Sequence, residues 1–495
     1  MMQFKHATRT MFVLAVLIKS SIAQEVIVHA DVSQTLEQRW NWANGQSKQT
    51  RFQKGFWIGY SIKRALEESS TIGSMHFKNG RVQRGPGKSL SELIYGVEMP
   101  LPKPTYSEKK FRPKIVKDLG LFFNFDPRDG ALVEIKESTF ELSVDFEGLT
   151  LLWLGPASDE SSFALIERLY RQASPAKIKE ELVGAAGLHH ESVRRRTFLA
   201  GILLGNEAAT VRKQAAFWLG QGEDPEALRI LKQTAKSDHA TEVRKLAVFA
   251  ISQMPIAETE EALFELANSP DDREVCKEAI FWLAQRGSQR TVALLKELVY
   301  KNNNAGLQKH IVFSLTQLPD KQGTPILHEV VEKHHSISVR KEALFWLGQS
   351  QEVSALRLLQ KMAQASEVME LRKQAVFALS QMRAPEAEET LIELARNAKD
   401  REVRKEALFW LAQKASKRAS ALLKETVQRD ADTEIQKQAI FALTQLPDDE
   451  GIPMLIEIAE QHGNMAVRKE AIFWLGQSDD ARATAALLKL VRGKE

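Results

Sequence analysis

From about residue 211 onward, apolar residues recur at helical spacing in short segments separated by turn residues. In VRKEALFWLGQ, which begins at Val339, the Val, the Ala four residues on, the Trp seven on and the Leu eight on share one arc at 100° per residue. This arc predicts the buried face of an amphipathic helix. Segments such as 227–235, 291–299, 354–363 and 390–395 predict a second set of helices between the first. Each unit is therefore predicted to be two antiparallel helices joined by short turns.

The unit repeats every 32 residues, and its polar side carries three residues that recur without a slip. A phenylalanine has a lysine four residues before it and a glutamine four after it, which places the three in a line on one helix face. The phenylalanines are Phe217, Phe249, Phe281, Phe313, Phe345, Phe377, Phe409, Phe441 and Phe473. A fixed period of this length predicts a solenoid, in which each repeat stacks on its neighbours.

The residue after each phenylalanine alternates between Trp and a small residue, as at Trp282, Ser314, Trp346 and Ala378. Placed in the core, these residues would interdigitate between neighbouring units. We therefore expect a structural cycle of two units, or 64 residues.

Polar residues mark the starts of the second helices, three positions before the leading Val or its equivalent. Their side-chain oxygens can accept hydrogen bonds from the free backbone N–H groups of a first turn. The predicted N-caps are Asp272, Asn304, Asp400, Asp432 and Asn464.

These segments resemble HEAT-like repeats, particularly the short phycobilisome-lyase type, whose second helix commonly begins with a Val-Arg pair and continues through Ala and Leu. The resemblance covers about residues 176–493. It implies a mainly α fold, a right-handed α-solenoid of about nine hairpins whose second helices line the concave wall. The Lys, Phe and Gln residues would then face that concavity. Fold alone does not assign an activity.

The chain before the array has a different pattern. Segments such as GFWIGYSIKR, GLFFNF and FELSVDF alternate or run apolar over strand lengths, with Gly and Asp-Gly turns between them. We predict a small β-rich domain over 24–160, an irregular helical cap over 161–210, and the solenoid with a C-terminal capping helix over 211–495. This order of elements is similar to that of secreted bacterial HEAT-repeat proteins of unassigned function.

Residues 1–23 have the three parts of a secretory signal peptide: Lys5 and Arg9, the apolar stretch 11–18, and small residues ending at Ala23. We therefore expect a secreted or periplasmic protein cut after Ala23. The apolar stretch is too short to span a bilayer. Removing the segment lowers the formal charge from +4 to +1, because three basic residues and no acid are lost. A near-neutral chain gives no electrostatic reason to expect a nucleic-acid partner.

No catalytic, metal or cofactor site is predicted. GPGKS at 85–89 lacks the first glycine of a phosphate loop, because Val82 occupies that position. The His-Glu pairs at His190 and His328 occupy non-equivalent places in the repeats, whereas HEAT-type iron hydroxylases carry such pairs at equivalent ones. The only cysteine, Cys276, replaces a repeat arginine and is expected to be a buried or half-buried, inert thiol. We therefore predict a protein that is not an enzyme.

The recurring polar side is the candidate binding site, and we call its lysines, phenylalanines and glutamines the Lys-Phe-Gln row. Two interpretations stay open. The rings could form a ladder that only stacks neighbouring repeats, or the row could bind an extended peptide or a protein surface. An enzyme-assisting role of the bilin-lyase kind, using the same groove, is the alternative function. The central row residues are Lys277, Phe281, Gln285, Lys309, Phe313, Gln317, Lys341, Phe345, Gln349, Lys373, Phe377, Gln381, Lys405, Phe409 and Gln413.

Overall fold

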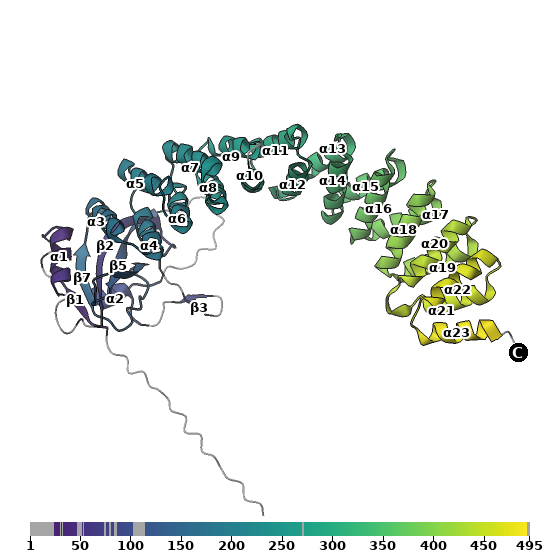
Figure 1. Ribbon diagram of the computed structural model, residues 1–495, viewed down its shortest axis with the longest axis horizontal. Coiled ribbons are helices and arrows are strands. Elements are labelled where there is room, and N and C mark those ends of the chain that lie inside the picture. The colour runs from purple at the N-terminus through teal and green to yellow at the C-terminus, as the bar shows by residue number, and fades with distance from the viewer. Residues whose placement is uncertain are drawn as a thin grey trace, which may run out of the picture. The chain divides into compact units, whose positions relative to one another are not determined.

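The computed structural model describes residues 24–492 except 30, 32, 47–51, 53, 74–75, 79–80, 84–86, 102–113 and 270–271. The predicted signal peptide over residues 1–23 lies outside the described residues. The chain divides into two compact units, Met1–Ile230 and Leu231–Glu495. A β-rich region followed by a helical solenoid is confirmed (Figure 1).

The first unit holds a mixed five-stranded sheet of order β1-β7-β2-β5-β6. Strand β7 is parallel to both β1 and β2, whereas β2, β5 and β6 run antiparallel to one another. A short hairpin of β3 and β4 forms a separate pair. The strands are β1 (Val26–Val28), β2 (Phe56–Glu67), β3 (His76–Lys78), β4 (Arg81–Gln83), β5 (Lys114–Phe125), β6 (Leu132–Thr139) and β7 (Leu151–Pro156).

Aromatic side chains fill the sheet core. Trp57, Phe122 and Trp153 are fully buried together with Phe146, and the Phe122 and Phe146 ring centroids are 5.0 Å apart. A Cβ at Gly59 would lie 2.6 Å from the Phe122 ring, so β2 needs glycine at this position to pair with β5. Helices α1 (Leu36–Gln46) and α2 (Leu90–Tyr95) belong to the same region. Ser89, from the GPGKS segment, caps α2 instead of opening a phosphate loop.

Four helices complete the first unit before the array takes up its regular form. Helix α4 packs against strand β6 and against α6. A Cβ at Gly187 would overlap the Trp218 ring at 1.9 Å, so the chain passes close to the ring only because this residue is glycine. The helices are α3 (Asp159–Gln172), α4 (Ala176–Gly187), α5 (Val193–Leu203) and α6 (Ala209–Leu219).

The two predicted sets of helices are confirmed. The second helices of the hairpins are α8 (Thr241–Gln253), α10 (Arg273–Arg286), α12 (Ala305–Leu315), α14 (Ile337–Gln349), α16 (Met369–Gln381), α18 (Arg401–Lys414), α20 (Thr433–Thr444) and α22 (Met465–Gly476). The first helices are α7 (Pro225–Ser237), α9 (Thr259–Ala267), α11 (Gln289–Lys301), α13 (Thr324–Lys333), α15 (Val353–Ala365), α17 (Pro385–Asn397), α19 (Lys417–Arg429) and α21 (Ile452–Gln461). Helix α23 (Ala481–Arg492) ends the array.

All five predicted N-caps are confirmed, because each side chain accepts a hydrogen bond from a backbone N–H of the first turn. Two of these aspartates also join adjacent repeats. Arg244 donates to Asp272 at 2.6 Å and Arg372 donates to Asp400 at 3.1 Å. In these two repeats, the arginine that follows the leading Val or Leu therefore binds the N-cap of the next repeat.

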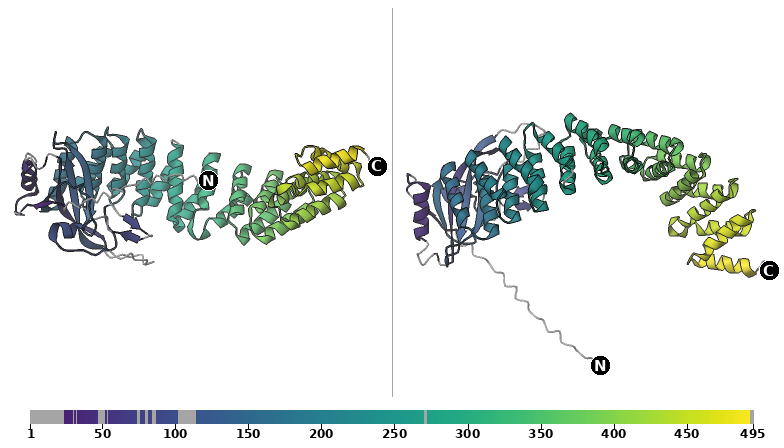
Figure 2. Two further views of the ribbon diagram at one scale, coloured as in Figure 1. Left: turned by 90° about the horizontal axis from the view of Figure 1, so that it is seen from below. Right: turned by 45° about the horizontal axis from the view of Figure 1, so that its top comes forward.

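Within the second unit the stacked hairpins follow a curve (Figures 1 and 2). The first helices α9, α11 and α13 lie along its outer edge, and the second helices α10, α12 and α14 lie along its inner edge. The helices that carry the Lys-Phe-Gln row are therefore on the inner side of this unit.

The turns that connect the hairpins repeat every four hairpins, or 128 residues. The 3-10 turns Pro319–Lys321 and Pro447–Asp449 begin 128 residues apart. The same interval relates the left-handed C-caps Gly287 and Ala415. The predicted 64-residue cycle thus describes the Trp alternation alone, because the loops that connect the hairpins repeat at twice that length.

Candidate functional site

The Lys-Phe-Gln row lies outside the core, on the second helices. In the central repeats its lysines and phenylalanines are half-buried and its glutamines are exposed. The core face beneath the row is formed on α14 by Val339, Ala343, Leu344, Leu347 and Gly348. That these row residues bind a partner stays a prediction.

Each described tryptophan of the array was expected in the core, and this prediction is wrong. Trp282, Trp346 and Trp410 are half-buried. The Trp346 indole N–H donates to Glu342, four residues earlier on the same helix, at 2.9 Å. Because the positions four, five and eight residues after the Val form the centre of the buried arc, the position seven after it lies at the edge. A small residue there, such as Ala378, is covered completely, whereas an indole extends onto the row.

Aromatic rings connect adjacent repeats along the row. The Phe313 and Trp346 centroids are 4.9 Å apart, and those of Phe377 and Trp410 are 4.7 Å apart. Phe345 stacks on Phe377 with a 10° angle between the ring planes. This geometry supports the stacking-ladder interpretation. The stacked rings still leave part of the row accessible to solvent, because the phenylalanine rings are only half-buried and the glutamines beside them are exposed.

Most central lysines of the row form ion pairs with glutamates. Lys277 lies 2.7 Å from Glu274 and Lys373 lies 3.0 Å from Glu402. The hydrogen bond to Glu402 raises the pKa of Lys373 above its usual value. Such half-exposed pairs contribute little stability, about 0–1 kcal/mol each.

A pocket of about 590 Å³ opens on the row between α12, α14 and α16. Lys309, Lys341, Phe345 and Gln374 belong to its lining, as does Ile337. Sequence patterns did not indicate this pocket, although three of its lining residues, Lys309, Lys341 and Phe345, belong to the row.

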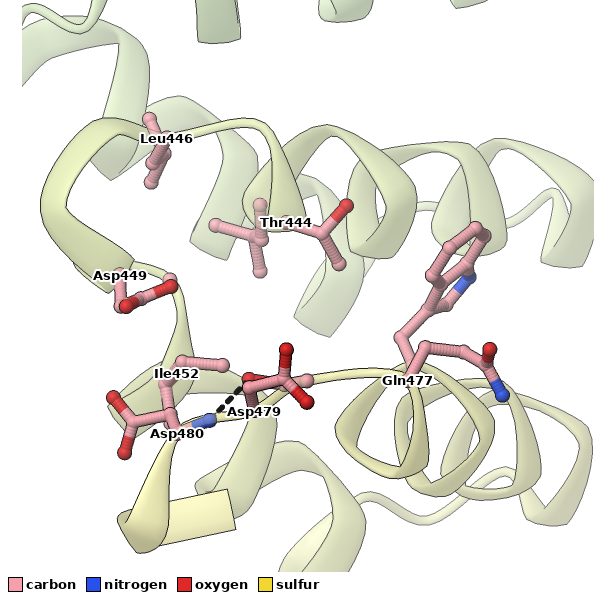
Figure 3. Close-up of a pocket in the computed structure, with 11 residues that line it drawn as sticks. Thr444, Leu446, Asp449, Ile452, Gln477, Asp479 and Asp480 are labelled. Carbon is pink, nitrogen blue, oxygen red and sulfur yellow. Dashed lines mark hydrogen bonds between the residues drawn. The ribbon is translucent and has the colours of Figure 1, made fainter.

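A second pocket of about 450 Å³ lies in the last repeats (Figure 3). Asp449, Asp479 and Asp480 are at its rim, and Ile452 and Trp474 provide apolar lining. Arg482 binds the Asp480 carboxylate at 2.5 Å and holds its pKa below the usual range. The carboxylates do not converge as metal ligands do: in the described part of the chain no three His, Cys, Asp or Glu residues gather around a metal-sized space.

His189, which precedes the His190–Glu191 pair, has a structural role. His189 is buried and hydrogen bonds through Nε2 to the Ser162 hydroxyl at 2.8 Å, which in turn lies 2.9 Å from the Tyr60 hydroxyl. Burial lowers the pKa of His189 to about 4, so the ring is neutral at pH 7. A nucleophile has to reach its substrate, and Ser162 is fully buried.

Two further residues flagged in the sequence also have local partners. Glu329, next to His328, pairs with Lys296 at 2.6 Å. Cys276 is buried, as predicted, and its thiol donates to the Ser269 carbonyl at 2.7 Å. None of the described helices is long and apolar enough to cross a membrane.

A family description, "HEAT repeats", matches the chain over residues 197–275, 235–315, 301–380, 324–412, 365–436 and 420–495. No curated protein matches the sequence. Among solved structures, human deoxyhypusine hydroxylase in complex with glycerol is similar at 16% identity over 53% of this chain and 96% of that chain, with a TM-score of 0.22. Kap121p is similar at 12% identity over 70% of this chain and 42% of its own, with a TM-score of 0.37. Kap95p bound to RanGDP is similar at 13% identity over 66% of this chain and 52% of its own, with a TM-score of 0.35.

Proposed function

We propose that this chain, which belongs to the HEAT-repeat family, is a scaffold that binds an extended peptide or a protein surface along the Lys-Phe-Gln row. The observation that carries the proposal is the row itself. Half-exposed aromatic rings and exposed amides follow one another on α10, α12, α14, α16 and α18. Aromatic anchors beside adaptable polar groups are the composition that protein interfaces favour.

The outer face offers a weaker site for a partner, because its charges are used within the array. Lys424 pairs with Glu457 and Arg396 with Glu425 across repeats. A partner that bound there would have to compete with these contacts. On the inner side the glutamine amides at the ends of the second helices are exposed.

Secretion or export to the periplasm is part of this proposal and rests on the signal-like segment 1–23. Mass spectrometry of the mature protein isolated from its source cells should find an N-terminus at Gln24. A mature chain that keeps Met1 would contradict this part and leave the binding proposal intact.

Site-specific photo-crosslinking in the source cells tests the binding surface. A benzophenone amino acid is placed at Gln285, Gln317 or Gln349 on the row, and at the exposed residues Arg357 or Glu393 of the first helices as matched controls. We expect discrete protein adducts from the row positions and none from the controls. Adducts from the control positions alone, or from no position, would contradict the proposal.

The bilin-lyase alternative predicts a different result from the same purified protein. A chromophore absorbing in the visible range, and retained through gel filtration, would favour that alternative over a protein-binding scaffold. We expect only the absorption of the protein's own Trp and Tyr residues.

A further inference from the structure

The ion pairs that row lysines form with glutamates are missing on two central helices, α12 and α14. Three of the row lysines pair with a glutamate three residues earlier on the same helix, at 2.7 Å for Lys277, 3.3 Å for Lys405 and 3.1 Å for Lys437. On α12 and α14 the corresponding residues are Gly306 and Ser338, which carry no charge. Among the described residues, Lys309 and Lys341 form no ion pair within 4 Å.

The ion pair that joins neighbouring repeats along the row is also missing between α14 and α16. Lys373 on α16 reaches Glu402 on α18 at 3.0 Å and closes the surface between the two helices. Lys341 on α14 and Glu370 on α16 occupy the equivalent positions one repeat earlier, yet no ion pair joins them. The 590 Å³ pocket lies there instead, and its lining includes Lys309 from α12, Lys341 from α14, and Glu370 and Gln374 from α16.

The pocket also has an apolar part. Ile337 is 42% exposed and lines the pocket beside Phe345. At the corresponding positions other repeats carry the polar Thr241, Arg273 and Arg401 but also the apolar Met369 and Met465. Ile337 therefore adds an exposed apolar side chain to a pocket that holds two lysines without an ion pair.

We propose that this α12–α16 pocket binds an extended peptide segment in which a carboxylate side chain adjoins an apolar side chain. The inference rests on the proposed function and names the chemistry of the partner at one point of the row. The carboxylate would pair with Lys309 and Lys341, which form no ion pair with the acids of the described chain. The apolar side chain would cover Ile337 and Phe345.

The two lining residues from α16, Glu370 and Gln374, suit a peptide backbone. Glu370 can accept a backbone N–H, and the Gln374 amide can both donate and accept. The other acid of the pocket, Glu342, already accepts the Trp346 indole N–H at 2.9 Å. A volume of about 590 Å³ lies within the range that binding pockets for compact ligands span.

The test uses a random dodecapeptide library displayed on phage and selected on the immobilised full-length protein. The selected peptides are then made synthetically with a fluorescent label, and their affinity is measured by anisotropy. The first variant is Lys309→Gln with Lys341→Gln. The control is Lys361→Gln with Lys424→Gln, which makes the same charge change on first helices outside the row, at lysines that pair with Glu332 and Glu457. Ile337→Arg tests the apolar part, and it places the residue that occurs naturally at Arg273 and Arg401.

We expect enriched peptides that carry Asp or Glu next to a large apolar residue. Their affinity should fall at least about tenfold in the first variant and in Ile337→Arg, because a charge-assisted contact or the apolar contact is lost. The control variant should bind within about twofold of the unaltered protein, since its lysines already have acidic partners. Replacing the peptide carboxylate by an amide should reproduce the loss.

Two results would overturn the inference, and they differ in what they say of the proposed function. Peptides that are enriched but bind the first variant and the unaltered protein equally would place the contact elsewhere on the row and leave the scaffold function standing. A library that yields no enriched peptide would count against both the pocket and the scaffold. Circular dichroism of each variant confirms that the helices are intact.

Discussion

An ion pair in the interior of the first compact unit contrasts with one on the outer face of the second. In the first unit, Lys117 and Glu141 pair at 2.9 Å with only 6% and 7% of their side chains exposed. In the second unit, Arg396 and Glu425 pair at 2.7 Å with 51% and 43% exposed. A buried charge destabilises the fold when its partner is removed, whereas removing one partner of an exposed ion pair costs little stability. The first unit therefore depends on its buried pair for stability, whereas the outer-face pair of the second unit contributes little.

The largest effect is expected from Lys117→Met. The substitution leaves the Glu141 carboxylate buried without its ammonium partner and removes the contacts to the carbonyls of Glu68 and Ser70, both at 2.9 Å. We expect a loss of about 3–5 kcal/mol in the free energy of unfolding of the first unit. Urea unfolding measures the loss, and amide hydrogen exchange in β5 locates it.

The double variant Lys117→Met with Glu141→Leu is the control, because it removes both charges from the interior. It should recover much of the loss. A single variant that costs less than about 1 kcal/mol would mean that the two units treat their ion pairs alike, and the comparison would fail.

The sequence was informative where contacts are local or repeat, and silent where they are not. The caps at Asp272 and Asp400 follow from residues within one turn, so spacing alone predicts them. The pair Lys117–Glu141 joins a strand to a later segment, and no periodicity marks such a contact. Trp346 was misplaced because its position lies at the border of the apolar arc, where size decides between burial and exposure.

The candidate site also has one part that the sequence predicts and one that it does not. The 32-residue period predicts the line of Lys, Phe and Gln residues. It does not predict the open pocket at Lys341, because the pocket depends on which glutamates reach across from the next helix, as Glu402 does for Lys373. The signal that could have found it is the uncharged pair Gly306 and Ser338, at positions where the flanking repeats carry Glu274 and Glu370.

The second prediction concerns the pH dependence of the first unit. Burial lowers the pKa of His189 to about 4 in the folded state, against 6.5 in an unfolded chain. Between these values the unfolded state binds the proton first, so stability falls as pH decreases from 6.5 to 4. The full loss is about 3 kcal/mol.

Glu137 contributes with the opposite sign over part of this range, because burial and Glu181 raise its pKa to about 7. The measurement therefore compares the unaltered protein with His189→Gln by urea unfolding from pH 4 to 8. Glu137 is present in both proteins, so its contribution cancels in the difference between their free energies of unfolding. The difference in stability should change with pH between 6.5 and 4 and be constant above pH 7.5. A difference that does not depend on pH would show that His189 keeps an ordinary pKa.

The third prediction probes the aromatic ladder, which is the part of the second unit's surface that does contribute to stability. Trp346→Ala removes the ring contacts to Phe313 and Phe345 and the hydrogen bond to Glu342. We expect a loss of about 1–2 kcal/mol, because aromatic pairs contribute about 0.5–1.5 kcal/mol beyond their buried area. Hydrogen exchange should show the loss in α12 and α14. Trp346→Phe, which keeps a ring at the position, should cost less, and equal losses in the two variants would contradict a ladder of rings.

The smallest effect is expected at the outer-face pair, where Arg396 and Glu425 join α17 to α19. Arg396→Gln should lower the stability of the second unit by less than about 1 kcal/mol, because both side chains are about half exposed and solvent screens their attraction. A double-mutant cycle with Glu425→Gln isolates the pair, and its coupling energy should disappear between 0.05 and 1 M salt, roughly as the screening length shortens. A coupling energy that survives at high salt would give the outer face a structural role like that of the buried pair in the first unit, and the contrast between the units would no longer hold.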